Sequence, residues 1–453
     1  MTFLRSAAAA AALLVLAGCA SFSPDGGFDT VAQLSRERIG QTPVLQRGVE
    51  PSATVRARVA ELLGQPLSAD AAVELALLNH RGLQARYAEL GIAEADLVQA
   101  GRLANPALRF GRLAGGAAVE IDRAVMFDVL GLLTMPLARQ AEQQRFEQAQ
   151  LRAAADTVSL AIEVRKAFFE AVAAQQLLGY QGQVKQAADA SAELARRMLA
   201  AGNFNKLSQM REQAFQVDAV AQLGRAQHQQ VATRERLTRL LGLDGVTQAF
   251  TLPERLPDLP ELPAASTEQA QLEQRAMDKR LDVLMARRAT AATASALGLS
   301  RATRFVNVLN AGYQNQSSSG EPRRNGYEIE LMLPLFDFGS ARVARAESVY
   351  LQALHQAAQV ATDARSQVRE AHSAYRSAYA LARHYRDELV PLRKRISEEN
   401  LLRYNGMLGS VFELLADARE QIAGVTGAVE AQRDFWLADA QLQAALAGAT
   451  PAP

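Results

Sequence analysis

The stretch "YEIELMLPL", residues 327–335, decides the fold class of this chain. Its residues alternate with a period of two, which is typical of a β-strand. A strand of a membrane β-barrel needs such alternation, because one face meets lipid and the other meets water. A half-buried strand of a soluble sheet alternates equally well, so the pattern alone leaves both interpretations open. One face carries Glu328 and Glu330, and the other carries Tyr327, Ile329, Leu331, Leu333 and Leu335.

A second stretch, "VEIDRAVMFDVLGLLTMPL" at residues 119–137, repeats the alternation with acidic residues at several even positions. We expect weaker partner strands at 107–113 and 304–316, and a polar, turn-rich loop at 317–326. The chain would then contribute four strands. Transmembrane barrels begin at about eight strands, so four strands in lipid would require several chains to share one barrel.

The placement of proline predicts two very long helices. No proline occurs between Pro136 and Pro253, and a second proline-poor stretch follows Pro334. Because proline breaks helix interiors, we expect helices at about 138–200 and 340–404. Each would be roughly 95 Å long at 1.5 Å per residue, which no compact domain accommodates.

The second of these helices carries a heptad pattern typical of coiled-coil packing. The apolar positions of this pattern, here called the seam, run from Val343 to Tyr385 and are mostly alanine. Gln367 is the one polar residue among them. Alanine allows helix axes to approach closely. The sequence therefore predicts a mainly α fold with a small β part, built from long helical hairpins.

An internal duplication organises the chain. Three pairs of landmarks each lie 198 residues apart, which argues for a repeated unit rather than coincidence. The serines of these pairs are expected to cap helices. The pairs are Ser68 and Ser266, Leu83 and Leu281, and Pro136 and Pro334.

The duplication and the proline pattern predict the domain organisation. The stretch "LPERLPDLPELP" between the repeats reads as an extended connector. The predicted parts are a lipoprotein signal peptide (1–18), an acylated, extended N-terminal segment (19–66), the first repeat (67–252), a proline-rich linker (253–265), the second repeat (266–446) and a C-terminal tail (447–453).

The only cysteine, Cys19, follows an apolar run at residues 7–17. A lone cysteine forms neither an internal disulfide nor a multi-thiolate zinc site. The apolar run is too short to span a bilayer but suits the core of a signal peptide. The sequence around Cys19 resembles a bacterial lipobox, whose cysteine is acylated, for example with palmitate; an ordinary signal peptide with a bystander cysteine is the alternative. The lipobox residues are Leu16, Ala17, Gly18 and Cys19.

Several classes of function lack support in the sequence. A formal net charge of +1 provides no basic field for nucleic acid. No catalytic constellation, phosphate-binding loop or cofactor motif is visible, so we expect neither an enzyme nor a cofactor. The histidines have no carboxylate or cysteine partners at ligand spacing, so we expect no metal site. They are His80, His228, His355, His372 and His384.

Residues 67–446 resemble the TolC-type family of outer-membrane efflux proteins. The resemblance rests on the duplication and on three motifs: "ANPAL" (104–108), "LPLFDFGSAR" (333–342) and "RYNGMLGSVFELLADAR" (403–419). It implies a homotrimer whose chains share a twelve-stranded transmembrane β-barrel and a periplasmic tunnel of helices. A periplasmic adaptor and an inner-membrane pump, of the proton-driven RND type, are the implied partners, together with outer-membrane lipid.

The resemblance also implies the position of functional residues. The helix tips are expected to form the tunnel mouth and to contact the adaptor, and a gate is expected just above them. Many relatives read Leu-Leu-Asp-Ala where this chain reads "LLAD", so Asp417 is turned by about 100°. This rotation would turn it toward a neighbouring helix, where Arg419 or Glu420 could pair with it. The gate candidates are Phe412, Leu415 and Asp417, and the tip candidates are Gly202, Asn203, Asn405, Gly406 and Gly409.

The function implied by this resemblance is a passive exit duct. The chain is expected to be the outer-membrane channel of a tripartite efflux pump for small toxic compounds, lipid-anchored with its helices in the periplasm. Two alternatives remain open: the outer-membrane outlet of a type I protein secretion system, and a periplasmic coiled-coil scaffold lipoprotein without a pore.

Overall fold

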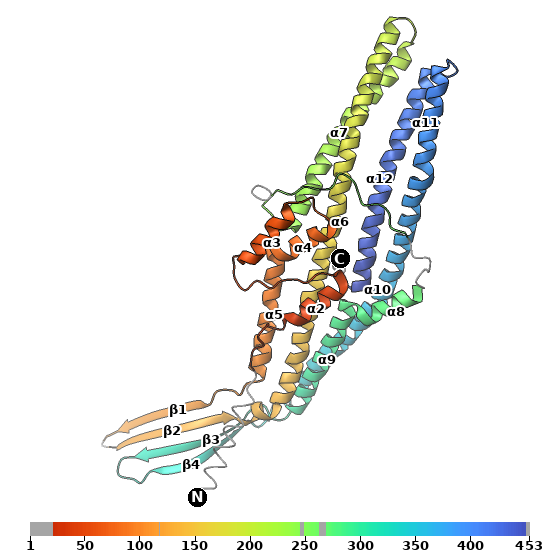
Figure 1. Cartoon of the computed structure of the whole chain (residues 1–453). Helices are drawn as coiled ribbons and strands as arrows, with labels where there is room; N and C mark the ends of the chain where they lie inside the picture. Colours follow the sequence, from red (N-terminus) through yellow and green to blue (C-terminus); the bar gives the residue numbers. More distant parts are fainter. Residues whose placement is uncertain (1–20, 117, 245–248, 262–268, 450–453) are drawn as a thin grey trace. The chain divides into compact units, whose positions relative to one another are not determined.

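The computed structural model describes residues 21–116, 118–244, 249–261 and 269–449 (Figure 1). The chain divides into two compact units. The sheet unit comprises Met1–Val31, Arg86–Ala154 and Leu281–Thr362. The hairpin unit comprises Ala32–Ala85, Ala155–Arg280 and Asp363–Pro453.

Four antiparallel strands form the sheet of the sheet unit, in the order β1-β2-β3-β4. The two repeats meet at the pairing of β2 with β3, where Val125 lies opposite Tyr313. The prediction of four strands per chain is confirmed. The strands are β1 (Ala107–Gly115), β2 (Ala118–Asp128), β3 (Leu309–Ser318) and β4 (Arg324–Leu331).

The predicted strand at 119–137 was wrong beyond Asp128, because the helix α6 (Val129–Ala200) begins there. The Oδ1 atom of Asp128 accepts a hydrogen bond of 2.7 Å from the amide of Gly131, an N-cap that starts the helix. Pro136 therefore lies inside α6 rather than before it.

Strand β4 likewise ends at Leu331, before the predicted end at Leu335. Pro334 has no amide to donate, and the turn after it is fixed by Asp337, whose Oδ1 accepts from the amide of Gly339 at 2.8 Å. Gly339 has φ +70°, and a Cβ there would lie 2.7 Å from the carbonyl oxygen of Arg304. Only glycine fits this close approach.

All the helices that flank the strands attach at one end of the sheet. α5 (Arg81–Ala100) leads into β1, α6 follows β2, α9 (Leu281–Ala302) leads into β3 and α10 (Ser340–His384) follows β4. The β1–β2 and β3–β4 turns lie at the opposite end (Figure 1).

The hairpin unit contains two long helical hairpins. The later part of α6 turns into α7 (Lys206–Leu240), and α11 (Val390–Asn405) turns into α12 (Val411–Ala447). A π-helical turn at Tyr385–Leu389 joins α10 to α11 and lets the helix continue into Pro391.

Alanine-rich clusters fill the core of this unit, and the one polar residue of the predicted heptad seam has a specific partner. Gln367 accepts through Oε1 a hydrogen bond of 2.7 Å from Arg280, which is fully buried. The other guanidinium nitrogen of Arg280 donates to the carbonyl of Ala445 at 2.6 Å. One core cluster comprises Leu272, Ala276, Val368, Ala371, Leu442 and Ala445.

The N-terminal segment 19–66, expected to be extended, contains two helices where it is described: α2 (Phe28–Ile39) and α3 (Ala53–Leu63). Side chains start both, since Asp25 accepts from the amide of Asp29 at 2.9 Å and Ser52 accepts from that of Val55 at 3.3 Å. Both helices are short, at 12 and 11 residues.

The duplication is visible in the order of the elements. α4 (Ala69–Asn79) and α5 precede the first strand pair, as α8 (Gln269–Lys279) and α9 precede the second. Ser68 caps α4 as predicted, while Ser266 lies outside the described residues. Leu83 and Leu281 both lie in the first turn of the second helix of each pair.

The described part of the predicted linker, residues 253–261, has neither helix nor strand, as expected. Side chains of the helices hold it: Gln176 accepts from the amide of Leu256 at 3.1 Å, and Trp436 donates to the carbonyl of Pro257 at 3.0 Å. Throughout the part of the chain that the structure describes, every helix is too short or too polar to span a bilayer.

Candidate functional site

The strand register determines which side chains share each face of the sheet, and one of the two faces is here called the apolar face. Even residues of β1 lie opposite odd residues of β2. Odd residues of β2 lie opposite odd residues of β3, and these lie opposite odd residues of β4. Many of its side chains are open to the surroundings, including Leu108 at 77 % and Tyr327 at 82 % exposure. The apolar members of this face are Leu108, Phe110, Ala114, Val119, Ile121, Val125, Phe127, Leu309, Ala311, Tyr313, Tyr327, Ile329 and Leu331.

The opposite face, here called the polar face, holds all the carboxylates of the four strands. Asn310 donates to Glu330 at 2.9 Å, and Arg109 forms an ion pair of 3.3 Å with Glu328. Arg109 lies on β1 and Glu328 on β4, so a flat sheet would separate them by roughly 14 Å. Their contact shows that the sheet curls toward its polar face.

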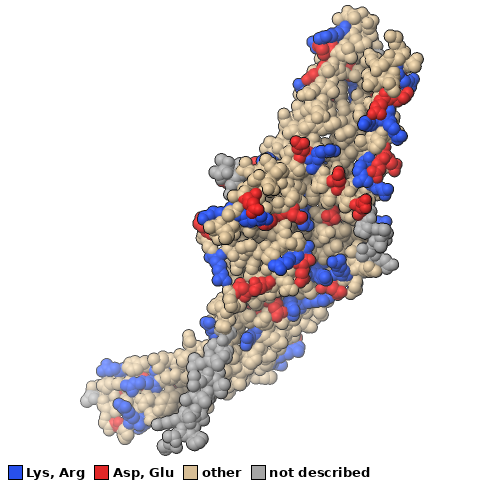
Figure 2. Space-filling view, viewed as in Figure 1, with Lys and Arg blue, Asp and Glu red and all other residues tan. Residues whose placement is uncertain are grey.

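Apolar exposure continues into the segment after β4. In the motif "LPLFDFGSAR", Leu333, Leu335 and Phe336 are 63 %, 69 % and 98 % exposed. Nearby, the guanidinium of Arg304 lies 5.1 Å from the ring centroid of Phe305. Figure 2 shows mostly uncharged surface in the strand region, with separate blue patches. Exposed apolar side chains gathered to this extent mark contact with lipid or with another protein.

The tip of the first hairpin is a tight turn, as predicted. Gly202 has φ +78°. The backbone amide of Asn203, an exposed residue, donates to the carbonyl of Met198 at 2.9 Å. Asn205 starts α7 by accepting from the amide of Ser208 at 2.8 Å. The turn is therefore fixed by a left-handed glycine and an asparagine cap.

The tip of the second hairpin lies at 406–410. Asn405 ends α11, and Gly406 has φ −82°, so the left-handed position in this turn belongs to Met407, at φ +59°. The turn closes at Gly409 and Ser410, and the Ser410 hydroxyl caps α12. Met407 is 94 % exposed.

The three gate candidates occupy different environments on α12. Phe412 belongs to this helix, but its side chain lies outside the described residues. Leu415 is partly buried against the cluster of Ala195, Phe204 and Val411. Asp417 is only 7 % exposed, and its Oδ2 has no hydrogen-bond partner among the described residues.

The expected partners of Asp417 are bonded elsewhere. Arg419 forms an ion pair of 2.6 Å with Glu212, and Glu420 forms one of 2.7 Å with Arg393. The proposed pairing of Asp417 with Arg419 or Glu420 was therefore wrong. Sequence reasoning also missed Glu413, whose exposed side chain lies on the same side of α12 as Ala416 and Glu420.

Glu212 links the two hairpins of the hairpin unit. It is 4 % exposed and accepts a hydrogen bond of 2.7 Å from the hydroxyl of Ser191 on α6. The guanidinium of Arg419, its partner on α12, also lies 4.8 Å from the ring centroid of Phe215. This contact between distant parts of the chain left no signal in the local sequence.

Two carboxyl groups on α6, those of Asp189 and Glu193, have pKa values below the ordinary value. The Lys185 ammonium hydrogen-bonds Asp189 and lowers the pKa of its carboxyl, with a further contribution from Gln216. Arg197 similarly lowers the pKa of Glu193. The tip region therefore presents fixed charges to its surroundings.

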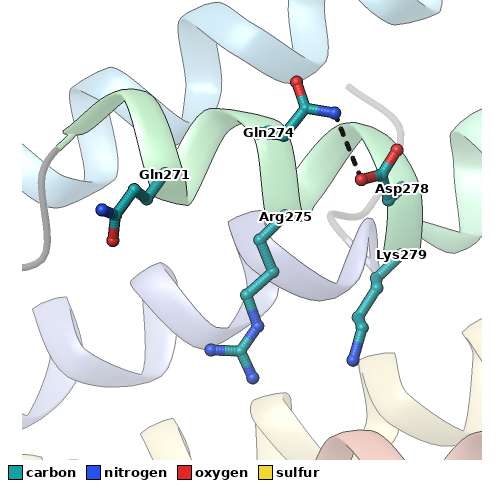
Figure 3. Close-up of a pocket in the computed structure, with 5 residues that line it drawn as sticks. All are labelled: Gln271, Gln274, Arg275, Asp278 and Lys279. Atoms are coloured by element: carbon teal, nitrogen blue, oxygen red, sulfur yellow. Dashed lines mark hydrogen bonds between the residues drawn. The ribbon is translucent and has the colours of Figure 1, made fainter.

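Among the described residues, no group of three or more His, Cys, Asp or Glu side chains could hold a metal ion. A pocket of ≈ 620 Å³ follows the exposed side of α8, where Gln274 donates to Asp278 at 3.2 Å (Figure 3). Arg275 and Lys279 extend together on another side of this helix (Figure 3).

The lipidation candidate Cys19 and the lipobox residues Leu16, Ala17 and Gly18 lie outside the described residues. The chain that follows is firmly held. Glu94 of α5, 7 % exposed, accepts from the amide of Ser23 at 2.7 Å, and Gln150 of α6 donates to the carbonyl of Gly27 at 3.0 Å.

Comparisons with known proteins identify the fold. No family model and no curated protein matches the chain. A membrane protein from Pseudomonas aeruginosa has a TM-score of 0.70 at 20 % identity, over 89 % of this chain and 99 % of that one. The outer-membrane channel OprN has a TM-score of 0.70 at 19 % identity, over 89 % and 94 %. The open state of the MtrE outer membrane channel of Neisseria gonorrhoeae has 0.67 at 17 %, over 90 % and 96 %.

The chain therefore has the fold of these outer-membrane channels, as the resemblance to the TolC-type family led us to expect. The likeness extends over both the sheet unit and the hairpin unit, because about nine-tenths of the chain is covered.

Proposed function

We propose that this chain is the outer-membrane channel of a tripartite efflux pump, a passive exit duct for small toxic compounds. The observation that carries the proposal is the sheet itself. Its apolar face is exposed, its polar face is concave, and four strands are too few to enclose water. Three copies would pool twelve strands into one barrel with the polar faces lining the lumen.

The helices suit the rest of this role. The hairpins would line a periplasmic tunnel, and their tips would meet a periplasmic adaptor that connects to an inner-membrane pump. Exposed Met407 and Leu408 at one tip, and Leu207 and Met210 beside the other, offer apolar contacts for such an adaptor. Flexible apolar side chains are suited to docking surfaces.

Single-channel recording tests this function. The purified full-length protein in a planar lipid bilayer is expected to conduct ions, and light scattering in detergent is expected to show three chains per particle. A trimer without conductance would favour the scaffold alternative, and a single chain per particle would contradict the proposal outright.

We infer that Glu413, rather than Asp417, contributes the carboxylate at the channel mouth. Three copies would form a ring of negative charge, which favours cations over anions. Glu413→Gln is expected to lower the cation-to-anion permeability ratio by roughly two- to fivefold. Reversal potentials in a salt gradient measure the ratio.

Asp417→Asn provides the matched control on the same helix. Because Asp417 is buried, its change is expected to leave the permeability ratio unaltered. If Asp417→Asn changed the ratio and Glu413→Gln did not, the assignment of the mouth carboxylate would be reversed.

We further propose that Cys19 carries the lipid anchor. Cys19→Ala is expected to abolish incorporation of labelled palmitate and to leave the precursor with its signal peptide attached, because the thiol is the acylation site. Gel mobility and mass spectrometry of the N-terminal peptide measure both changes. Retention of a mature, acylated N-terminus in the variant would contradict the lipobox assignment.

A further inference from the structure

Two arginines interrupt the apolar face of the sheet. The register places Arg112 of β1 opposite Ile121, and Arg123 of β2 opposite Phe110, all on this face. Both side chains are exposed. The two arginines are diagonal neighbours on adjacent strands, a relation that separates Cβ atoms by roughly 7–8 Å.

No carboxylate shares the apolar face with them in any of the four described strands. The five acidic residues of the strands all lie on the polar face, and Glu328 there already pairs with Arg109. Those five residues are Glu120, Asp122, Asp128, Glu328 and Glu330.

Most guanidinium N–H groups of Arg112 and Arg123 have no hydrogen-bond acceptor among the described residues. Arg123 donates to Oδ1 of Asn315 at 3.1 Å, and Asn315 donates to Asn325 at 2.6 Å, so a polar row crosses three strands. A guanidinium offers five N–H donors, and carboxylate and phosphate oxygens are its best acceptors. Two adjacent cations with no anion on their face need a counter-charge from outside the chain.

A second copy of the chain does not supply that charge. In a barrel of three copies, β1 would meet β4 of the next copy. The apolar face of β4 carries Asn325, Tyr327, Ile329 and Leu331, none of them acidic. The counter-charge must therefore come from what surrounds the barrel.

The position along the strands indicates which surroundings these are. Arg112 lies three residues before the end of β1 at the β1–β2 turn, and Arg123 lies at the middle of β2. This turn is at the end of the sheet opposite the flanking helices (Figure 1). One row nearer the helices, Tyr313 lies opposite Tyr327, and aromatic rings mark the edge of the apolar band of membrane barrels. An arginine on the lipid face costs only about 0–1 kcal/mol at such an edge.

We propose that Arg112 and Arg123 form a binding site for the phosphate groups of lipopolysaccharide in the outer leaflet. The inference rests on the proposed function, because it takes the helices to lie in the periplasm and the strand turns to face the cell exterior. Acyl chains would pack on the apolar residues beside the arginines, and the lipid A phosphates would accept from the guanidinium groups.

The test uses the purified, full-length trimer in detergent and a fluorescent lipid A, with and without its phosphates. Wild type is expected to bind the phosphorylated lipid at least tenfold more tightly than the dephosphorylated one. Arg112→Gln and Arg123→Gln are each expected to weaken binding about tenfold, through loss of charge-assisted hydrogen bonds. Arg112→Lys and Arg123→Lys are expected to retain much of the affinity, because they keep the charge.

Arg324→Gln is the matched control, since Arg324 is also an exposed strand arginine but lies on the polar face of β4. It is expected to leave lipid binding unchanged. Equal weakening by Arg324→Gln, no preference for the phosphorylated lipid, or equal binding to phosphatidylglycerol vesicles would each overturn the site.

Conductance separates this inference from the proposed function. Variants that conduct like wild type but lose lipid binding support the site. A wild type that conducts normally without discriminating between the two lipids removes only this inference. A wild type without trimers or conductance removes the proposed function and the site together.

Discussion

Ile329→Arg is expected to keep the protein from inserting into lipid. Ile329 lies on the apolar face between Tyr327 and Leu331 and is 64 % exposed, so its side chain would point into the hydrocarbon. A cation on the lipid face costs up to about 2–4 kcal/mol, depending on its depth in the bilayer, and three chains would each bear that cost in one barrel. The fraction of folded trimer in liposomes, judged by heat-modifiable mobility on gels, measures the effect.

Gln314→Arg is the control for this prediction. Gln314 lies on β3 opposite Gly326 and belongs to the polar face, where a charge would meet water. Insertion of this variant is expected to match wild type. If both variants inserted equally well, the apolar face would not be in lipid, and the barrel would lose its main support.

Arg280→Ala is expected to cause the largest loss of stability in the hairpin unit. Arg280 has no exposed surface, and its guanidinium reaches both Gln367 and the carbonyl of Ala445. Truncation leaves a cavity and deprives the buried carbonyl of Ala445 and the half-buried side chain of Gln367 of this donor, at a cost of about 3–5 kcal/mol. The thermal midpoint of the helical circular-dichroism signal, compared with that of wild type, measures the loss.

Two further variants sharpen that prediction. Arg280→Lys is expected to recover only part of the stability, because one ammonium does not reproduce the forked geometry that bonds both acceptors. Arg275→Ala, at an exposed position on α8, is expected to change stability by less than about 0.5 kcal/mol. A similar loss in Arg275→Ala and Arg280→Ala would refute the structural role of the buried cation.

The sequence predicted the elements of the fold better than their ends. Period-two alternation located the strands because burial and exposure alternate along each one. It did not reveal that Asp128 starts a helix, since alternation persists for several residues after the cap. In the same way, the heptad pattern revealed the seam of α10. It did not explain the polar Gln367, whose hydrogen-bond partner Arg280 is distant in sequence.

The candidate site was predictable where local rules apply. The glycine turn at Gly202 follows from the need for a positive φ, and the structure contains it. The bonding of Arg419 to Glu212 depends on the packing of separate helices, which no local pattern encodes. The distribution of charge between the two sheet faces was likewise hidden until the register between strands was known.

A single chain pairs Arg109 of one edge strand with Glu328 of the other, so the lone subunit neutralises this one charge at each open edge within itself. Exposed strand edges otherwise invite indiscriminate pairing. In a ring of three subunits, each Arg109 would face the Glu328 of its neighbour. Each ion pair broken within a subunit would then be replaced by the same ion pair between two subunits. The same two residues would then pair with each other in the newly exported subunit and join neighbouring subunits in the assembled trimer.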